Sequence, residues 1–260
     1  MTTHRFSITA RTAVVAGALT LAACSEDATS PNRTRVLPGN ISAVDNPDLS
    51  RNVVLSPVVD GRIGRGEYTG AASFTFVAQI PSVFNVLKTP VTVYVTHDQT
   101  HLYLAATFDR KSAFHPLDVV AFEFDNDNDG DREDGDDIVF IRPSTPQNVA
   151  GTVSDFYRYN GGAANWWDTN DGGTLDGISA WGTIGTKGVF EIRHPLNSAD
   201  DAHDVSINPW IFPQTVGLQT GVRLEGGAVG SNMAATTHHP SFTTYCKLTI
   251  SQSSTGVACP

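Results

Sequence analysis

The sequence is short of positive charge. Its 17 lysines and arginines stand against 27 aspartates and glutamates, which gives a formal net charge of −10 at pH 7. Nucleic acids and anionic lipid headgroups attract basic surfaces, and this chain is acidic. The composition therefore excludes a nucleic-acid partner and argues against attachment to a membrane by charge.

Catalytic motifs are also lacking. The chain contains no GxSxG, no Gly-rich phosphate loop and no HExxH. The histidines are scattered: His203 lies within DDAHD, and His238-His239 precede Pro240. A catalytic zinc site needs three protein ligands, so a solvent-facing or structural role is favoured for them. Carboxylates are too abundant to single out a glycosidase pair. We predict that the chain is not an enzyme.

The apolar run near the N-terminus is short. It spans residues 13–23, after a head that carries Arg5 and Arg11. A membrane-spanning helix needs about 20 apolar residues, so length and flanks indicate an export signal. Removing residues 1–23 takes away two arginines and no acid, which moves the formal charge from −10 to −12.

The signal ends in Leu-Ala-Ala-Cys24, which resembles the lipobox of bacterial lipoproteins. In that family the signal is cut before the cysteine, whose thiol is lipidated. We expect a signal peptide over 1–23, lipid on Cys24 and, because Ser25 follows rather than Asp, sorting to the outer membrane. An ordinary signal with a chance cysteine is the alternative.

Cysteine is scarce, with three in the chain, an odd number for an exported protein. If Cys24 carries lipid, Cys246 and Cys259 remain near the C-terminus. Export places them in an oxidising compartment, where a pair is expected to form a disulfide. Two free thiols are the alternative.

Residues 24–51 are rich in Ser, Pro, Asn and Asp without an apolar period, which predicts a flexible tether. Residues 52–260 are long enough for one domain with a sizeable core. Short runs there alternate apolar and polar residues and are separated by Gly, Asn, Asp and Pro. No amphipathic helix stands out. We predict an all-β fold, an antiparallel sandwich or barrel, with strands at 73–80, 91–98, 101–108, 119–125, 137–143, 188–196, 216–226 and 245–250. Asp98-Gln99-Thr100 is predicted to turn a hairpin.

The most acidic stretch is DNDNDGDREDGDD, residues 125–137, with eight acids and one arginine. Calcium takes six to eight oxygen ligands, mainly carboxylates and carbonyls. The spacing D-x-D-x-D-G is that of an EF-hand loop, but the flanking runs are strands and the twelfth position holds Asp136 rather than Glu. We predict a structural calcium loop that closes a β-hairpin, with these ligands: Asp125, Asp127, Asp129, Asp131, Glu133 and Asp136. A solvated acidic turn is the alternative.

Two further groups follow in the sequence. Asp168, Asn170, Asp171 and Asp176 form a weaker oxygen cluster, which the neighbouring glycines explain as turn chemistry; a second calcium is the less favoured interpretation. Before them, DFYRYNGGAANWWD supplies four aromatic residues, Tyr157, Tyr159, Trp166 and Trp167. Exposed rings of this kind stack on sugar faces, whereas core packing is the alternative. If Trp166 and Trp167 lie on a strand, they face opposite ways.

Three segments together resemble family 9 carbohydrate-binding modules and the wider group of DOMON-like domains. They are VVDGRIGRGEY (58–68), VTVYVTHDQTHLYLAATF (91–108) and DVVAFEFDNDNDGDREDGDD (118–137), and GVFEIRHPLNSADDAHDVSI (188–207) resembles the group as well. The resemblance covers about residues 53–226 and implies a β-sandwich. It also implies calcium and a terminal sugar held between aromatic rings, at positions that the motifs do not assign.

The resemblance leaves three functions open. The favoured one is a non-catalytic lipoprotein that binds carbohydrate or a cell-surface polymer. The second is a structural or adhesive surface module with structural calcium. The third follows a sister branch that binds haem through a methionine; Met233 is the only methionine after the signal, and it lies outside the strand framework, so haem is not expected.

Overall fold

The computed structural model describes residues 56–81, 86–109, 114, 118–143, 147–159, 161–170, 172–200, 202–208, 210, 213–224, 237–241 and 244–260. The predicted signal peptide, Cys24, the tether, Asp171 and Met233 lie outside these residues. No helix in the described part is long and apolar enough to cross a membrane.

The described chain is almost entirely β-structure, as predicted. Its strands are β1 (Ala72–Pro81), β2 (Val86–His97), β3 (His101–Asp109), β4 (Val119–Asp125), β5 (Asp137–Ile141), β6 (Gly151–Thr152), β7 (Ser154–Tyr159), β8 (Ala164–Trp167), β9 (Ile178–Ile184), β10 (Lys187–Pro195), β11 (Gln214–Arg223), β12 (Thr237–His239), β13 (Cys246–Ser251) and β14 (Ser254–Ala258), with one 3₁₀ turn, η1 (Asp168–Asn170). Each run predicted as a strand is one. Strands β6, β7, β8, β9, β12 and β14 were not predicted.

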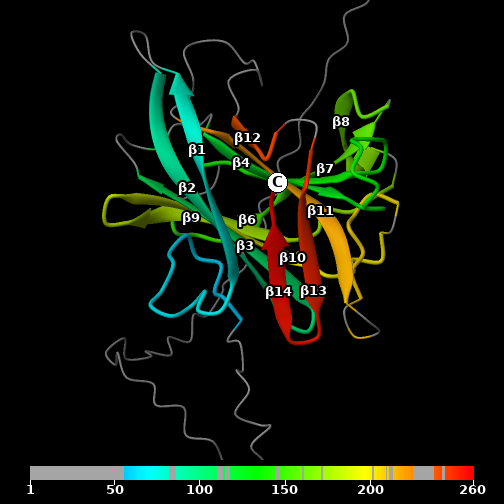
Figure 1. The fold of residues 1–260 in the computed structure, drawn as a ribbon, viewed down its shortest axis with the longest axis horizontal. Coiled ribbons are helices and arrows are strands. Elements are labelled where there is room, and N and C mark those ends of the chain that lie inside the picture. The colour runs from blue at the N-terminus through cyan, green and yellow to red at the C-terminus, as the bar shows by residue number, and fades with distance from the viewer. Residues whose placement is uncertain are drawn as a thin grey trace, which may run out of the picture. The chain divides into compact units, whose positions relative to one another are not determined.

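The strands form two antiparallel sheets that pack face to face (Figure 1). One sheet has six strands in the order β1-β2-β3-β10-β9-β6. The other has eight, with the order β14-β13-β11-β4-β5-β7-β8 and β12 paired to β11 beside that path. The architecture is therefore a β-sandwich, which confirms the predicted fold class.

Alternate residues of both sheets form one core between them. Along β4, Phe122 and Phe124 point inward and are fully buried. They pack in the same cluster as Val93 of β2 and Leu104 of β3, which belong to the other sheet. Because the side-chain period of a strand is two, the residues between these face away from the core. On β4 those residues are Val119, Ala121 and Glu123.

The D-G-x-I motif folds over the outer face of the six-stranded sheet. Glu191 on β10 points into this loop, and its Oε2 accepts hydrogen bonds from the backbone N–H of Gly61 (2.8 Å) and of Arg62 (3.1 Å). Gly61 has a φ of +78°, and a Cβ there would lie 2.4 Å from the carbonyl oxygen of Trp181. Glycine is therefore required where the loop approaches the sheet most closely.

The β2–β3 hairpin turns at the predicted residues. Asp98 Oδ1 accepts hydrogen bonds from the backbone N–H of Thr100 and of His101, both at 2.8 Å. The phenolic O–H of Tyr103 donates to the other carboxylate oxygen at 2.6 Å. This side-chain-to-backbone bonding is the usual reason for aspartate at a turn.

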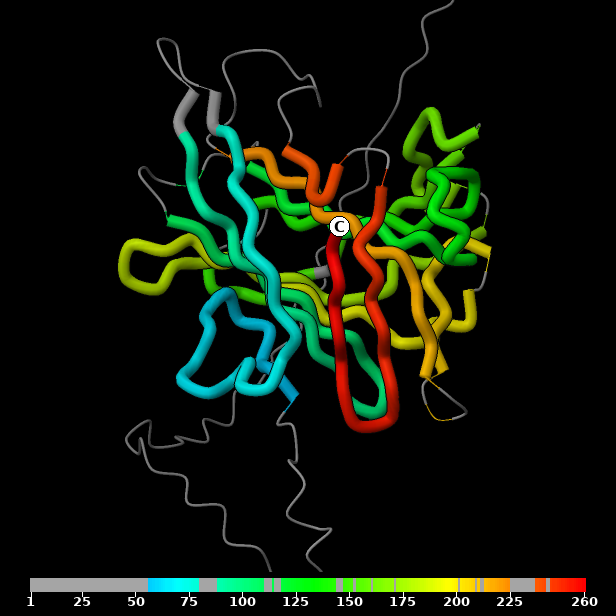
Figure 2. Tube along the Cα trace, viewed as in Figure 1, coloured from blue at the N-terminus to red at the C-terminus, as the bar shows by residue number. Residues whose placement is uncertain are grey.

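The chain ends in the hairpin β13–β14, which lies beside the first hairpin, β1–β2 (red and cyan in Figure 2). His97 of β2 and Thr255 of β14 are joined by a 2.6 Å hydrogen bond. Cys246 at the start of β13 and Cys259 just after β14 form a disulfide with an S–S distance of 2.03 Å. The predicted pairing is thus present in the structure.

Loss of this disulfide should destabilise the domain. It closes a loop with a sequence separation of 13 residues, which corresponds to about 3 kcal/mol in the chain-entropy model. We expect Cys246→Ala/Cys259→Ala to lower the free energy of unfolding by about that amount in a denaturant titration. A reductant should shift the wild-type midpoint and leave that of the double variant unchanged. Two alkylatable thiols in the exported, unreduced protein would contradict the pairing.

Candidate functional site

The outer face of the eight-stranded sheet carries a pocket with an apolar floor and polar walls. Strand alternation explains it, since the residues that flank the inward-facing phenylalanines of β4 must point outward. β5, β7 and β11 contribute their outward residues in register with them. The lining consists of Val119, Ala121, Glu123, Arg132, Ile138, Phe140, Arg158, Asn165, Gln219, Gly221 and His238.

Glu123 organises one wall of this pocket. Arg132 donates from Nε to Oε1 at 2.6 Å and from Nη2 to Oε2 at 2.5 Å. Arg158 grips the same two oxygens from its Nε and, at 2.7 Å, from its Nη2. Paired guanidinium–carboxylate forks of this kind are strong and directional. The two guanidinium groups are therefore held in fixed positions at the pocket, although both come from long, flexible side chains.

Side-chain amides and an imidazole complete the walls. Gln219 Nε2 donates to the carbonyl oxygens of Ser241 (2.5 Å) and Thr244 (3.1 Å), which leaves Oε1 as the acceptor facing His238 Nδ1 at 3.0 Å. Burial lowers the pKa of His238 to about 4, so the ring is neutral at pH 7 and its Nδ1–H donates to Gln219. Asn165 is fixed by Arg158 Nη1, which donates to its Oδ1 at 2.6 Å.

The four predicted aromatic residues do not form one surface. Residues directly opposite in the β7–β8 ladder lie on the same side of the sheet. Trp167 pairs with Phe156 on the outer face, where the ring centroids are 3.9 Å apart. Trp166 projects from the other side and lies against Tyr159, with centroids 5.3 Å apart. Both tryptophans are 43% exposed, so β8 presents one tryptophan on each face.

Tyr157 is buried, in contrast to its predicted ligand-facing role. Its side of β7 points inward, and its exposed fraction is 7%. The ring packs edge-on against His203, with centroids 4.7 Å apart. Its ring face is therefore covered by protein, and we remove Tyr157 from the candidate ligand contacts. Of the four, Trp167 alone lies on the outer face that carries the pocket.

The acidic loop joins β4 to β5, as predicted, and winds around the Asp125 carboxylate. Asp125 Oδ2 accepts from Gly130 N at 2.9 Å, and Oδ1 accepts from Asp129 N at 3.2 Å. Asn128 has a φ of 59° and Gly130 a φ of 90°. These left-handed conformations allow the backbone to turn tightly around the carboxylate. One carboxylate oxygen each from Asp125, Asp127 and Asp129 lie within 4.8 Å of one another.

The other three predicted ligands are placed differently. Asp136 is buried, and its Oδ2 accepts hydrogen bonds from Tyr245 O–H (2.9 Å) and Glu133 N (3.0 Å). Asp131 and the Glu133 side chain are exposed. The charges of Asp129 and Asp127 raise the pKa of Glu133, which places its carboxylate in the same negative field. The structure thus gathers three of the six carboxylates closely.

A second group of carboxylates was missed by sequence reasoning. Asp137, Asp155, Asp168 and Asp204 are all at most 2% exposed, as is His194. One ligand atom each from Asp155, Asp168 and Asp204 lie within 4.8 Å of one another, and the same holds for Asp137, His194 and Asp204. The turn interpretation fits exposed Asn170 and the bond from Gly173 N to the Asp168 carbonyl oxygen (2.8 Å), but the Asp168 carboxylate itself is buried. A sequence signal existed: Asp155 and His194 occupy inward positions of alternating strands.

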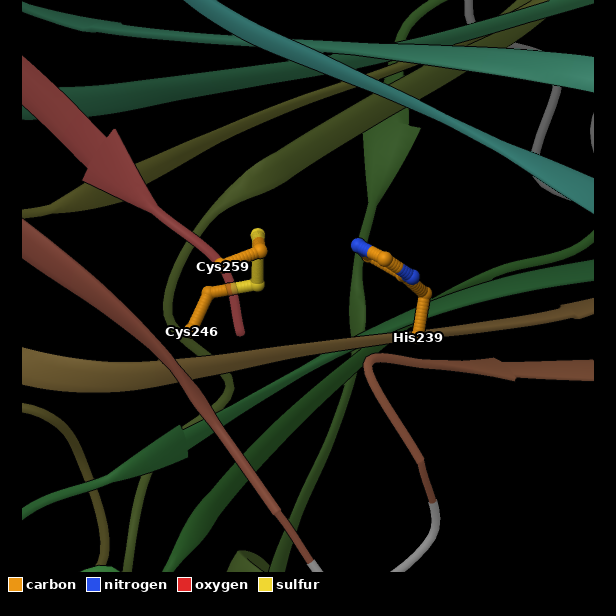
Figure 3. Close-up of side chains that lie close together, drawn as sticks. All are labelled: His239, Cys246 and Cys259. Atoms are coloured by element: carbon orange, nitrogen blue, oxygen red, sulfur yellow. A yellow bond between two sulfur atoms is a disulfide. The ribbon is translucent and has the colours of Figure 1, made fainter.

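His239, Cys246 and Cys259 also lie close together (Figure 3). The two sulfurs are bonded to each other, so neither is available as a thiolate ligand. The His239 ring stacks on Phe76, with centroids 4.9 Å apart and planes 3° from parallel. This group is a packing cluster, and it is not a candidate metal centre.

No protein-family model matches the chain, and no curated protein matches it. Among solved structures, it is similar to a carbohydrate binding module family 9 (CBM9) from Caldicellulosiruptor kristjanssonii. The structure in complex with cellotriose is 16% identical, with a TM-score of 0.41 over 70% of this chain and 77% of that chain. The structure in complex with glucose is 15% identical, with a TM-score of 0.39 over 66% and 76%. The β-sandwich fold itself is established by the two sheets described above.

Proposed function

We propose that the chain is a non-catalytic module that binds carbohydrate on the outer face of its eight-stranded sheet. The observation that carries this proposal is the exposed ring of Trp167 on the same face as the pocket walled by Glu123, Arg158, Asn165 and Gln219. An apolar platform beside a few convergent, fixed polar groups is the usual form of a small-molecule site.

The chemistry of this face suits a sugar. One face of a pyranose ring is a patch of C–H groups that packs on an indole, while its hydroxyls both donate and accept hydrogen bonds. The guanidinium group of Arg158 offers donors, and the amide of Asn165 offers both kinds of group. Their ion pairs and hydrogen bonds hold them in place before a ligand arrives, which lowers the entropy cost of binding.

The same geometry opposes hydrolysis. A glycosidase of the usual kind needs two carboxyl groups on either side of the scissile bond, about 5 to 9.5 Å apart. Glu123 is the sole acid among the residues that line the pocket, and two arginines engage both of its oxygens. It therefore serves as a brace, and binding without turnover is the function proposed.

The two tryptophans of β8 provide a matched test. We expect Trp167→Ala to weaken binding of soluble glucan, xylan or mannan oligosaccharides at least about tenfold in isothermal titration calorimetry. Trp166→Ala removes an equally exposed ring from the opposite face and should leave the affinity unchanged. The proposal is wrong if no oligosaccharide or parent polysaccharide binds, or if both variants lose affinity equally.

We propose calcium as the ion of the 125–136 loop. Calcium–oxygen distances of 2.3 to 2.6 Å separate ligands on opposite sides of the ion by at most about 5 Å, and the three gathered carboxylates satisfy that limit. Asp131 and Glu133 are the acids that would turn toward the ion. Its role is structural, because it would offset repulsion among carboxylates in a tight connection between two strands.

Calcium should raise the thermal stability of the domain. At a hundredfold excess over Kd the gain is about 2.7 kcal/mol, or about 5 to 10 °C for a domain of this size. Asp127→Ala/Asp129→Ala should abolish the shift on adding calcium to chelator-stripped protein. Asp109→Ala/Asp134→Ala removes the same charge outside the predicted ligand set and should retain it. Identical wild-type melting curves in calcium and in chelator, at matched ionic strength, would contradict calcium binding and show that the stretch is only an acidic turn.

We also propose that Cys24 anchors the chain to the outer membrane through lipid. Each buried CH₂ contributes about 0.8 kcal/mol, and several acyl chains anchor a protein firmly. We expect Cys24→Ala to release the protein from the membrane fraction or to leave its signal uncleaved. Cys246→Ala/Cys259→Ala, which removes the other two cysteines, should remain membrane-bound. Unchanged fractionation of Cys24→Ala would refute lipidation.

A further inference from the structure

The buried carboxylate group lies at one end of the core, between the two sheets. Asp137 begins β5 and Asp155 lies on β7, both in the eight-stranded sheet, and both point inward beside Val139. His194 lies near the end of β10 in the six-stranded sheet, opposite core residue Leu102. The segment after β10 adds Asp204. Four separate parts of the chain therefore bring polar side chains to one enclosed place.

The hydrogen bonding of His194 fixes what its ring offers. Its Nδ1 lies 2.8 Å from the carbonyl oxygen of Pro195. A carbonyl only accepts, so Nδ1 carries the proton and Nε2 of the neutral ring carries a lone pair. His194 is fully buried, which disfavours the charged form of its ring. Nε2 is buried and has no hydrogen-bond partner among the described residues.

The ring of His194 lies close to two buried carboxylates. The ligand atoms of His194, Asp137 and Asp204 all lie within 4.8 Å of one another. Two acceptors facing each other in a buried place repel unless a proton or a cation lies between them. Asp137 Oδ1 and Asp155 Oδ1 are likewise buried without a hydrogen-bond partner in the described part of the chain.

Among the described residues, no arginine or lysine pairs with Asp137, Asp155 or Asp204. One oxygen of Asp137 accepts from Val205 N (3.2 Å) and one oxygen of Asp155 from Asp176 N (2.9 Å). Asp155 and Asp204 are both buried and lie close together, so burial and mutual repulsion disfavour their charged forms. The protein alone thus stabilises these carboxylates poorly.

We propose that Asp137, Asp204 and His194 bind one first-row divalent transition-metal ion, zinc or manganese, with Asp155 and Asp168 beside it. An imidazole nitrogen among carboxylates favours such ions, whereas calcium takes oxygen ligands. The bond from His194 Nδ1 to a backbone carbonyl is the support that metal-binding histidines usually have. The ion joins the two sheets at the end of the sandwich, and its role is structural because the site is enclosed.

The direct test measures metal binding by tag-free, chelator-stripped protein. We expect one equivalent of zinc or manganese to remain bound after gel filtration, by inductively coupled plasma mass spectrometry. The same ion should raise the melting temperature. His194→Gln should weaken binding at least about tenfold, within the range seen when the surroundings of a metal site are altered, and Asp137→Asn should weaken it further.

A crossed measurement separates a metal ligand from a packing residue. In stripped protein, Asp137→Asn should melt at the same temperature as wild type or higher, because an amide replaces a buried carboxyl group that the protein alone stabilises poorly. With zinc or manganese present, it should melt below wild type. A residue that only packs would lower the melting temperature in both conditions, and that result overturns the proposal.

Two control variants keep this site distinct from the others. His97→Gln changes another buried histidine and should retain the bound ion. Asp127→Ala/Asp129→Ala should lose the response to calcium and retain that to zinc or manganese. The proposal fails if stripped wild type binds neither ion, if His194→Gln binds as tightly as wild type, or if calcium alone binds in a way that depends on Asp137. None of these results bears on sugar binding at the outer face.

Discussion

A carboxylate withdrawn from water needs donors or a counter-charge, and much of this fold outside its apolar core is arranged around that need. Glu191 is met by the backbone N–H groups of the loop at Gly61, which fixes the chain leading into the first strand. Glu123 is met by two arginines, and that pairing shapes the pocket. Because the chain has fewer basic than acidic residues, arginines cannot pair with every buried carboxylate. Backbone amides and turns are the means left for its other buried acids, as Asp125 shows with its bonds from Asp129 N and Gly130 N.

The strands were predictable because alternation is a local property. Val93 and Phe122 belong to runs in which every second residue is apolar, and each such run became a strand. Turn chemistry at Asp98 was equally local. Strands such as β8 and β14 were missed because they are four and five residues long at sheet edges. Because these short edge strands are exposed on one side, they contain too few apolar residues to show a two-residue alternation.

The sites were less predictable, because they depend on which strands meet. The loop at Asp125 could be found since its acids are consecutive in sequence. Asp137 and His194 are 57 positions apart and belong to different sheets, so no spacing connects them. The alternation of side chains along a strand likewise determines on which side of the sheet each aromatic residue lies. Trp166 and Trp167 are neighbours in sequence, yet they face opposite ways. A polar residue at an inward position of an otherwise regular strand was the available signal, and it required the strand assignment first.

The two edges of the eight-stranded sheet differ in how they are held. At one edge, the disulfide closes the β13–β14 hairpin, so fraying there cannot separate the last strand from its neighbour. At the other edge, β8 has four residues and is bonded on one side to β7. Local opening of a sheet begins where the fewest contacts must be broken. Amide hydrogen exchange should therefore be faster in β8 than in β14, and any molecule that packs on Trp167 clamps the more labile edge.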